Sequence, residues 1–255
     1  LRVYAYGSGR ATDGTVNSDG SPKRRAVLSL FDYKTPLADP DTLLLRLSDE
    51  ESAGICARYA TLIGLTGSRP ITVRERGQVW IKEGDVEFPL KNWADGYRLT
   101  FQWYLDLWYS CLQFGEGKLD VQRDPVGLLM VDELALHLHP NLQSSLLGNF
   151  TKSLPNLFCI FTTHSPLVTL GLPSNRLLVL QKDGGAVSSS QPRNTQGYTV
   201  EDLITDPEIF NTSPYSAQKT EDLAAWRDMM KKAPHEMTPE EREPFAELTQ
   251  RVMTQ

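Results

Sequence analysis

The sequence predicts an α/β fold with a mainly parallel sheet flanked by helices. Residues 126–131 form an apolar run that ends at Asp132 and Glu133, and residues 157–163 form a second run that ends at His164. A helical stretch separates the two runs. Apolar runs without polar alternation are typical of strands buried on both faces, and a strand–helix–strand unit builds a parallel sheet. We therefore expect the two acids and the imidazole at the carboxyl edge of that sheet, where such folds bind ligands.

Composition limits the classes of protein that the chain can belong to. A length of 255 residues and a hydrophobic content of 40% allow one large or two small domains with a real core. The net charge of −6 argues against a globally basic nucleic-acid binder and leaves DNA binding by a local patch open. The three cysteines are scattered, which favours a reducing, cytoplasmic compartment, and no apolar run approaches the roughly 20 residues of a membrane span.

The beginning of the chain carries no phosphate-binding motif. Residues 1–6 alternate like a strand already in progress, without an initiating Met, so we expect an upstream portion of the protein. Residues 7–25 are rich in Gly, Ser, Asp and Thr and are interpreted as a surface loop. The pattern Gly-x-x-x-x-Gly-Lys-Ser/Thr of a P-loop occurs nowhere in the sequence.

The middle of the chain is expected to be helical with one hairpin. Residues 37–47 and 50–65 show helical apolar spacing, and Asp39 or Asp41 can cap the first of these helices. A hairpin follows, with its turn at residues 83–85. Residues 99–114 are almost wholly apolar, which predicts a buried helix.

The end of the chain is expected to be a helical extension. A strand at residues 176–181 precedes a polar stretch, 185–196, that is interpreted as a mobile loop. Helices are then predicted at residues 198–205 and 221–232, and a final one begins at a capping box formed by Thr238 and Glu241. The last two helices form a hairpin that either packs on the core or is presented to a partner.

The order of these features resembles one segment of a known ATPase family. The apolar run, Asp-Glu, His-Leu-His-Pro, a helix from Pro140, the second apolar run and Thr-Thr-His-Ser-Pro look like the Walker B, D-loop and switch-histidine segment of ABC-type ATPase heads. The sequence is most similar to the RecF-like, SMC-like and OLD-like branch of AAA-family ATPases, which is common in bacterial anti-phage defence and DNA-maintenance systems. The resemblance implies an ABC-ATPase-like fold with a helical lid subdomain, and cofactors ATP and Mg²⁺.

The resemblance also implies roles for the polar residues at the two strand ends. Asp132 would hold Mg²⁺ through water, and Glu133 would orient and polarise the attacking water. His164 would donate a hydrogen bond to the γ-phosphate. His137 and His139 would lie in the D-loop, at the dimer interface beside the nucleotide.

A second segment, residues 93–98, resembles the ABC signature motif, which reads Leu-Ser-Asp-Gly-Tyr-Arg in this branch. Ala94 stands where the family usually has Ser, so the hydroxyl that contacts phosphate is missing, while Asp95, Gly96, Tyr97 and Arg98 match. In the family this motif closes over the γ-phosphate held by the other subunit. The alternative reading is a helix cap with a glycine turn, whose free N–H groups and positive dipole end also suit an anion.

The resemblance divides the chain into four parts. These are the end of an N-terminal lobe with a loop, a helical lid with a hairpin, the ATPase core, and a C-terminal helical extension, at residues 1–35, 36–92, 93–183 and 184–255. The implied function is ATP hydrolysis by a head that dimerises around nucleotide and regulates an effector, such as a nuclease. The implied partners are therefore a P-loop-containing half or subunit, a second head and the effector, and the chain alone is expected to be inactive.

Two other functions remain open at this point. The absent P-loop and Ala94 are compatible with a degenerate ATPase lobe that serves as a scaffold. His137 and His139, on one side of an extended segment near Asp132 and Glu133, are compatible with a metal-dependent hydrolase.

Overall fold

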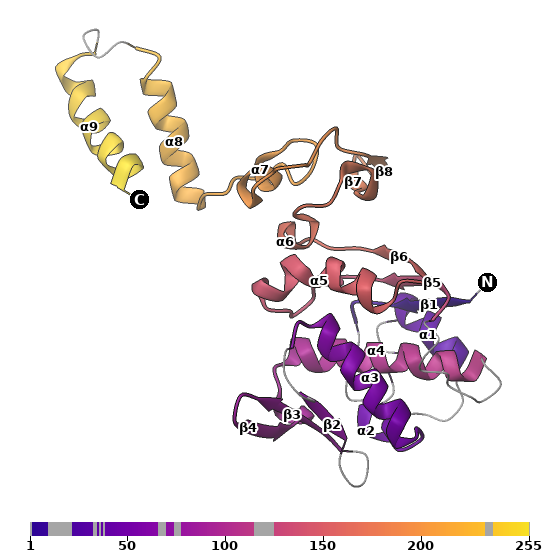
Figure 1. The fold of residues 1–255 in the computed structure, drawn as a ribbon. Coiled ribbons are helices and arrows are strands. Elements are labelled where there is room, and N and C mark those ends of the chain that lie inside the picture. The colour runs from indigo at the N-terminus through magenta and orange to yellow at the C-terminus, as the bar shows by residue number, and fades with distance from the viewer. Residues whose placement is uncertain are drawn as a thin grey trace. The chain divides into compact units, whose positions relative to one another are not determined.

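The computed structural model describes residues 2–9, 22–32, 35, 37, 39–65, 70–73, 78–114, 125–232 and 237–254. The chain divides into two compact units, Leu1–Val168 and Thr169–Gln255. Both are drawn in Figure 1. All residues of the candidate site lie in the first unit.

A parallel sheet forms the base of the first unit. Its strands are β1 (Val3–Tyr6), β5 (Gly127–Val131) and β6 (Leu157–Phe161), in the order β1-β5-β6. The register pairs the last residue of β5, Val131, with Tyr6 of β1 and with Phe161 of β6. The predicted α/β fold with a parallel sheet and flanking helices is therefore confirmed.

The two faces of this sheet differ in how well they are covered. One face is packed into the main core through Tyr4, Tyr6, Leu129, Val131, Cys159 and Phe161. On the other face, Ala5 of β1 is fully buried beside helix α1 (Pro22–Phe31), whose Ser29 hydroxyl donates to the Ala5 carbonyl. Phe158 and Ile160 of β6 lie on this second face and are 70% and 48% exposed. This second face of the sheet is therefore buried at β1 and exposed to solvent at β6.

Helices of the first unit begin where the sequence provides caps. Asp39 caps α2 (Pro40–Leu44), and Ser48 forms a capping box with Glu51 at the start of α3 (Asp49–Leu62). The first unit also contains α1, the 20-residue helix α4 (Asp95–Phe114) and helix α5 (Pro140–Ser153). The hairpin region is a small antiparallel sheet of β2 (Ile71–Val73), β3 (Val79–Glu83) and β4 (Val86–Pro89), followed by the short helix η2 (Leu90–Asn92).

Helix α4 is the centre of the core. Its side chains from Phe101 to Trp108 are almost completely buried, as its all-round apolar sequence predicts. Trp103 stacks on Phe150 of α5, with ring centroids 5.8 Å apart, and lies 5.6 Å from the ring of Tyr6. The buried Asp106 accepts a hydrogen bond from the Tyr6 hydroxyl at 3.1 Å, so a polar pair fixes α4 to the first strand. Burial, followed by the Asp106 charge, raises the pKa of Tyr6 well above its usual range.

The cysteines are free thiols and take no part in the candidate site. Cys56 of α3 is buried, and burial raises the pKa of its thiol to about 12. Burial of this kind makes a thiol a poor nucleophile at neutral pH.

Two sequence-based boundaries need correction. Residues 22–25 were expected in the loop, but they belong to α1, because Pro22 occupies a helix start, where its missing N–H is not needed. Residues 10–21 of the expected loop lie outside the described residues. The polar stretch after residue 185 was expected to be a mobile loop, but its first part is strand β8 (Ala186–Ser190), paired with β7 (Val179–Asp183). Gly184 and Gly185 have positive φ angles and make the tight turn between the two strands.

In its described residues, the second unit contains that hairpin, a short 3₁₀-helix and three α-helices. The short helix α6 (Pro166–Thr169) lies at the division between the units, and η3 (Ser174–Arg176) follows it. Helix α7 (Val200–Thr205) is capped by Thr199, and α8 (Ala217–Met229) and α9 (Pro239–Thr254) form the predicted helical hairpin. Of the helices that the structure describes, none has the length and apolar character needed to cross a bilayer.

Candidate functional site

The ends of two neighbouring strands bring the candidate residues together. Because Val131 and Phe161 are paired in register, the residues that follow them, Asp132 and Thr162, leave the sheet side by side. The Thr162 N–H donates to the Val131 carbonyl at 3.1 Å and continues the ladder past the end of the strand. The site is thus built directly on the sheet edge at which parallel strands present their carboxyl ends.

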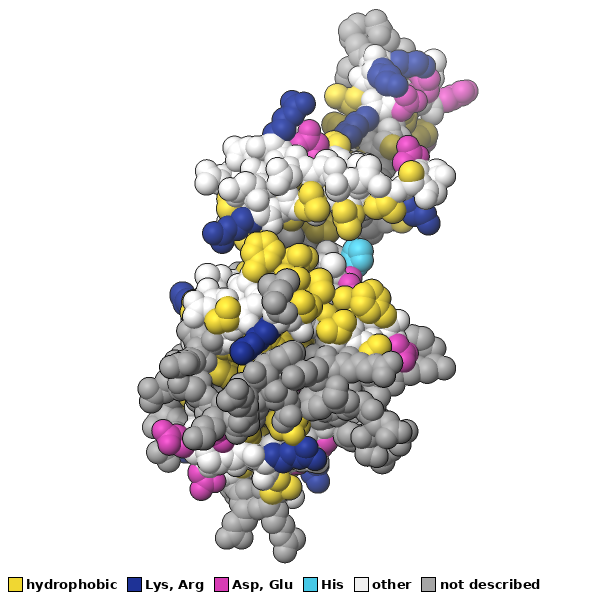
Figure 2. All heavy atoms as spheres, turned by 90° about the vertical axis from the view of Figure 1, so that its right-hand side faces the viewer, with side chains coloured by type: hydrophobic (Ala, Val, Ile, Leu, Met, Phe, Trp, Pro, Cys, Tyr) yellow, Lys and Arg dark blue, Asp and Glu magenta, His cyan; other side chains and the backbone are white. Residues whose placement is uncertain are grey.

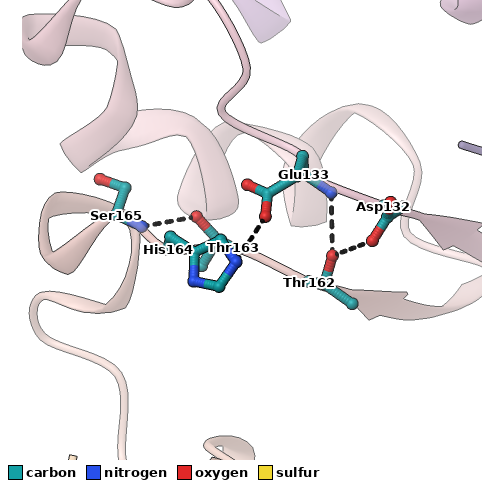
Figure 3. Close-up of polar contacts among 6 residues, drawn as sticks. All are labelled: Asp132, Glu133, Thr162, Thr163, His164 and Ser165. Atoms are coloured by element: carbon teal, nitrogen blue, oxygen red, sulfur yellow. Dashed lines mark hydrogen bonds and ion pairs between the residues drawn. The ribbon is translucent and has the colours of Figure 1, made fainter. Parts of the chain in front are cut away.

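Thr162 connects both acids, as Figure 3 shows. Its hydroxyl donates to Oδ1 of Asp132 at 2.6 Å, and its Oγ1 accepts the N–H of Glu133 at 2.9 Å. One hydroxyl therefore acts as donor and acceptor at once, and it holds a carboxylate and a backbone group in a defined relation.

Glu133 adopts a backbone conformation that few residues adopt. Its φ is +50°, in the left-handed region that is unfavourable for side chains other than Gly, Asn and Asp. The Glu133 N–H donates to Thr162, as described, and the Glu133 carbonyl accepts the N–H of Leu136 at 3.0 Å. The N–H of the next residue, Leu134, donates to the Thr162 carbonyl, also at 3.0 Å. These bonds compensate a backbone strain of about 1–3 kcal/mol. The chain leaves strand geometry here, so the two adjacent acids need not point to opposite sides of the sheet.

Glu133 and His164 form the outer part of the site. His164 Nε2 lies 3.1 Å from Glu133 Oε1, and the two side chains are 93% and 25% exposed, respectively. A polar contact this accessible contributes about 0–1 kcal/mol to stability at most. The imidazole is therefore placed beside the acid at little energetic cost and remains open to a ligand.

Residues 93–98, here called the 93–98 turn, form the start of helix α4. Ala94 is exposed, and its carbonyl accepts the N–H groups of Tyr97 and Arg98. The Arg98 guanidinium bonds to Oδ1 of Asp95 at 2.8 Å, and this hydrogen bond lowers the pKa of the Asp95 carboxyl. Tyr97 stacks on Trp93 with ring centroids 4.3 Å apart. Tyr97 and Arg98 thus stabilise the turn itself.

Gly96 joins the 93–98 turn to the segment after Glu133. A Cβ on Gly96 would overlap the carbonyl group of His137. Only a glycine allows helix α4 to approach the 133–139 loop this closely, and His137 itself has a φ of +64°. The structure therefore brings Asp95, Gly96 and His137 together in one place.

His139 has a defined structural task. Its Nδ1 accepts the N–H of Asn141 at 3.3 Å, and it is the N-cap residue of α5, directly before Pro140. The cap thus occupies the Nδ1 atom of the ring, and Nε2 is not part of this hydrogen bond. Among the residues that the structure describes, no three His, Cys, Asp or Glu side chains converge as a metal-binding group.

Two polar residues of the site carried no role in the sequence interpretation. Thr162 follows the second apolar run directly, in register with Asp132, and this position is the signal that could have identified it. Gln143 of α5 forms hydrogen bonds with Leu138, before the helix, and with Ser165, in the loop that follows β6. Neither contact can be read from helical or strand periodicity.

Replacing Thr162 with valine tests the connection at the strand ends. We expect a loss of about 1–3 kcal/mol in the free energy of unfolding, because the Glu133 N–H loses its partner and valine fills the same volume without a hydroxyl. Urea unfolding of the wild type, Thr162→Val and Thr162→Ser measures this loss. The serine variant keeps the hydroxyl and serves as the control. A valine variant as stable as the wild type would show that these hydrogen bonds do not organise the strand ends.

A known protein family matches the part of the chain that contains this site. Residues 81–170 match the family model described as "AAA domain, putative AbiEii toxin, Type IV TA system". The chain is 38% identical over 96 residues to "Septu protein PtuA" of Bacillus thuringiensis. This match covers 36% of this chain and 24% of that protein.

Two further relatives carry the word ATPase in their names. Identity is 34% over 56 residues to "Retron Vc95 probable ATPase" of Vibrio cholerae serotype O1 biovar El Tor, covering 22% of this chain and 11% of that protein. Identity is 36% over 58 residues to "Retron Ec83 probable ATPase" of Escherichia coli, covering 23% and 11%. The chain thus matches a quarter or less of the length of these relatives. The matches therefore show that residues 81–170 are similar to an AAA domain, and that part of the chain is similar to a Septu protein and to retron proteins named probable ATPases.

Proposed function

We propose that this chain supplies the magnesium-binding and water-orienting half of an ATP-hydrolysing site. The observation that carries the proposal is the convergence of Asp132, Glu133 and His164 on one sheet edge, connected through Thr162 and through the Glu133–His164 contact. Phosphoryl transfer to water depends on positioning and charge stabilisation, and these groups suit both tasks.

The donor set at the strand ends fits Mg²⁺. This ion prefers oxygen ligands and is usually held by one or two carboxylates together with water and substrate phosphates. Asp132, oriented by the Thr162 hydroxyl, would hold it through water. When bound, the ion would neutralise the negative charge that develops on the phosphates during hydrolysis.

Glu133 and His164 are assigned to the reacting end of the nucleotide. Glu133 would accept a hydrogen bond from the attacking water and aim it at the γ-phosphate. His164, which is almost fully exposed, would donate to a γ-phosphate oxygen. The 3.1 Å contact between them keeps the acid and the donor adjacent, as attack on one phosphorus atom requires.

The 93–98 turn is assigned to the nucleotide of a second head. Ala94, Asp95 and Gly96 stand at the N-terminus of a 20-residue helix, where free N–H groups and the helix dipole favour an anion. Tyr97 and Arg98 support the turn through the contacts described above. His137 packs against Gly96, and His139 caps the following helix, so both would shape the dimer interface beside the nucleotide.

A P-loop must come from sequence beyond these 255 residues or from another chain. Parallel sheets are normally covered on both faces. In the described part of the chain β6 is an edge strand, and its Phe158 and Ile160 are exposed. Figure 2 shows hydrophobic side chains exposed on the first unit, on the face that it turns to the viewer. We propose that the P-loop-containing half docks at this edge, next to His164.

The names of the relatives suggest the biological setting. Septu and retron proteins are among the relatives that match part of this chain, and the retron proteins are named probable ATPases. We propose that the complete ATPase acts in bacterial defence, that its heads dimerise around ATP, and that this dimerisation regulates a partner effector such as a nuclease.

The direct test compares the chain alone with the assembled ATPase. We expect the 255-residue chain to show only background ATP hydrolysis, because it lacks the backbone nest and lysine that hold the phosphates. Addition of the P-loop-containing part is expected to produce Mg²⁺-dependent hydrolysis, measured as phosphate release.

Two outcomes would count against this proposal. Hydrolysis by the chain alone at the rate of the assembled enzyme would refute the shared site. ATP binding by the assembly with no hydrolysis would instead favour a scaffold, which is the alternative that Ala94 suggests.

A further inference from the structure

Gln143 contacts two loops from one position on helix α5. Its Nε2 donates to the Leu138 carbonyl at 2.8 Å, and its Oε1 accepts the hydroxyl of Ser165 at 2.6 Å. The side chain is half-buried, which limits the access of water to both bonds. A single amide thus joins the 133–139 loop to the 162–165 loop.

Each of these loops carries a different part of the candidate site. Leu138 follows His137, whose carbonyl group lies against Gly96 of the 93–98 turn. Ser165 follows His164, which contacts Glu133. Gln143 therefore lies between two parts of the site. One is the contact of Gly96 with the His137 carbonyl, and the other is the exposed imidazole of His164.

The chemistry of this position requires a primary amide. Leu138 offers a carbonyl, which needs a donor, while the Ser165 hydroxyl donates and needs an acceptor. Glutamine has both groups at the end of one side chain. Glutamate has the same shape but no donor, and leucine has neither group, so substitutions can remove one bond or both.

The 162–165 loop is otherwise held mainly at its beginning. Thr162 is bonded to β5 and to Asp132, and the N–H of Ser165 donates to Oγ1 of Thr163 at 3.0 Å within the loop itself. The Ser165–Gln143 bond fixes the far side of His164 to a helix. With Thr162 on one side and Ser165 on the other, the backbone of His164 is anchored at both ends.

We propose that Gln143 is a positioning residue that fixes the His164 loop to the 133–139 loop. Any displacement of the 133–139 loop, against which Gly96 packs, is thereby passed to the imidazole. This inference rests on the proposed ATPase function, because it assigns Gln143 to the geometry of that reaction. Gln143 itself does not touch the nucleotide.

Hydrogen exchange of the 255-residue chain tests the connection without any ATPase activity. Amide exchange is measured by mass spectrometry for residues 133–139 and 162–165. In Gln143→Leu both loops are expected to exchange about tenfold faster. In Gln143→Glu, which keeps the acceptor for Ser165, the increase is confined to 133–139, and in Ser165→Ala it is confined to 162–165. Ser145→Ala, on the same helix and with a local bond to Leu142, is the control and is expected to leave both loops unchanged.

The same variants in the assembled ATPase test the role in the reaction. For Gln143→Leu we expect kcat to fall about 10- to 100-fold, the size of effect seen when an outer residue that orients a catalytic group is removed. The KM for ATP is expected to stay within about twofold, because Gln143 contributes to positioning and not to binding. The double variant with Ser165→Ala is expected to be no slower than Gln143→Leu, since both changes break the same bond.

The two proposals fail in different ways. Faster exchange in both loops with unchanged kcat would overturn the role of Gln143 and leave the ATPase proposal intact, and unchanged exchange would overturn the connection itself. A wild-type assembly without ATP hydrolysis would refute the proposed function, and the catalytic role of Gln143 with it, even where the exchange pattern is as expected.

Discussion

Replacing Glu133 with glutamine is expected to slow ATP hydrolysis by the assembled ATPase by about 10²- to 10⁴-fold, the range for loss of a general base. The amide keeps the shape of the side chain and its place beside His164, but it no longer attracts the proton of the attacking water. ATP binding is expected to persist, so the ATP-bound dimer accumulates. Single-turnover hydrolysis and size-exclusion chromatography with ATP and Mg²⁺ measure the two effects.

The same substitution at a distant glutamate distinguishes loss of the water-orienting group from a general loss of negative charge. Glu247 lies exposed on α9, outside the first unit, and Glu247→Gln is expected to hydrolyse ATP at the wild-type rate. If Glu133→Gln also hydrolyses ATP at that rate, Glu133 is not the water-orienting group. The scaffold interpretation then gains support.

Replacing Gly96 with alanine is expected to destabilise the first unit by about 1–3 kcal/mol, the usual cost of overpacking a close contact. The added Cβ would overlap the His137 carbonyl group, and both partners are backbone, so one of the two segments must move. The assembled ATPase is expected to lose most of its activity as well, because the 93–98 turn separates from the 133–139 loop. Urea unfolding and ATP hydrolysis are the measurements.

Gly148 provides the control for the glycine substitution. It lies within helix α5, and a Cβ there would meet no atom within 4 Å. Gly148→Ala is therefore expected to stabilise the protein by about 0.5–1 kcal/mol, as alanine does in a helix interior. Equal effects of the two alanines would mean that the approach of Gly96 to His137 has no structural importance.

The strand–helix–strand unit could be predicted because each of its parts has a local signal. Two uninterrupted apolar runs are typical of buried parallel strands, and Pro140 is favoured at the first position of a helix. Asp39 was one of two candidate caps for α2 and is the one that the structure uses. The AAA-family resemblance rested on motifs within residues 93–166, and the family match spans that same region.

Other features depend on contacts that no local pattern reveals. The register between β5 and β6 decides that Thr162 meets Asp132, and neither sequence segment carries this information alone. His139 was interpreted as a residue of the dimer interface, and the structure adds that its ring caps α5. Strand β8 lies in a serine-rich stretch with no apolar alternation and forms because the Gly184–Gly185 turn pairs it with β7.

The central claim is that Asp132, Glu133 and His164 act on one nucleotide. The most direct measurement is a structure of the assembled ATPase with ADP, Mg²⁺ and aluminium fluoride, which imitates the phosphoryl group in flight. We expect Mg²⁺ beside Asp132, a water between Glu133 and the fluoride group, and His164 within hydrogen-bond distance of that group. A nucleotide bound elsewhere, with these three side chains facing solvent or separated from one another, would contradict the account.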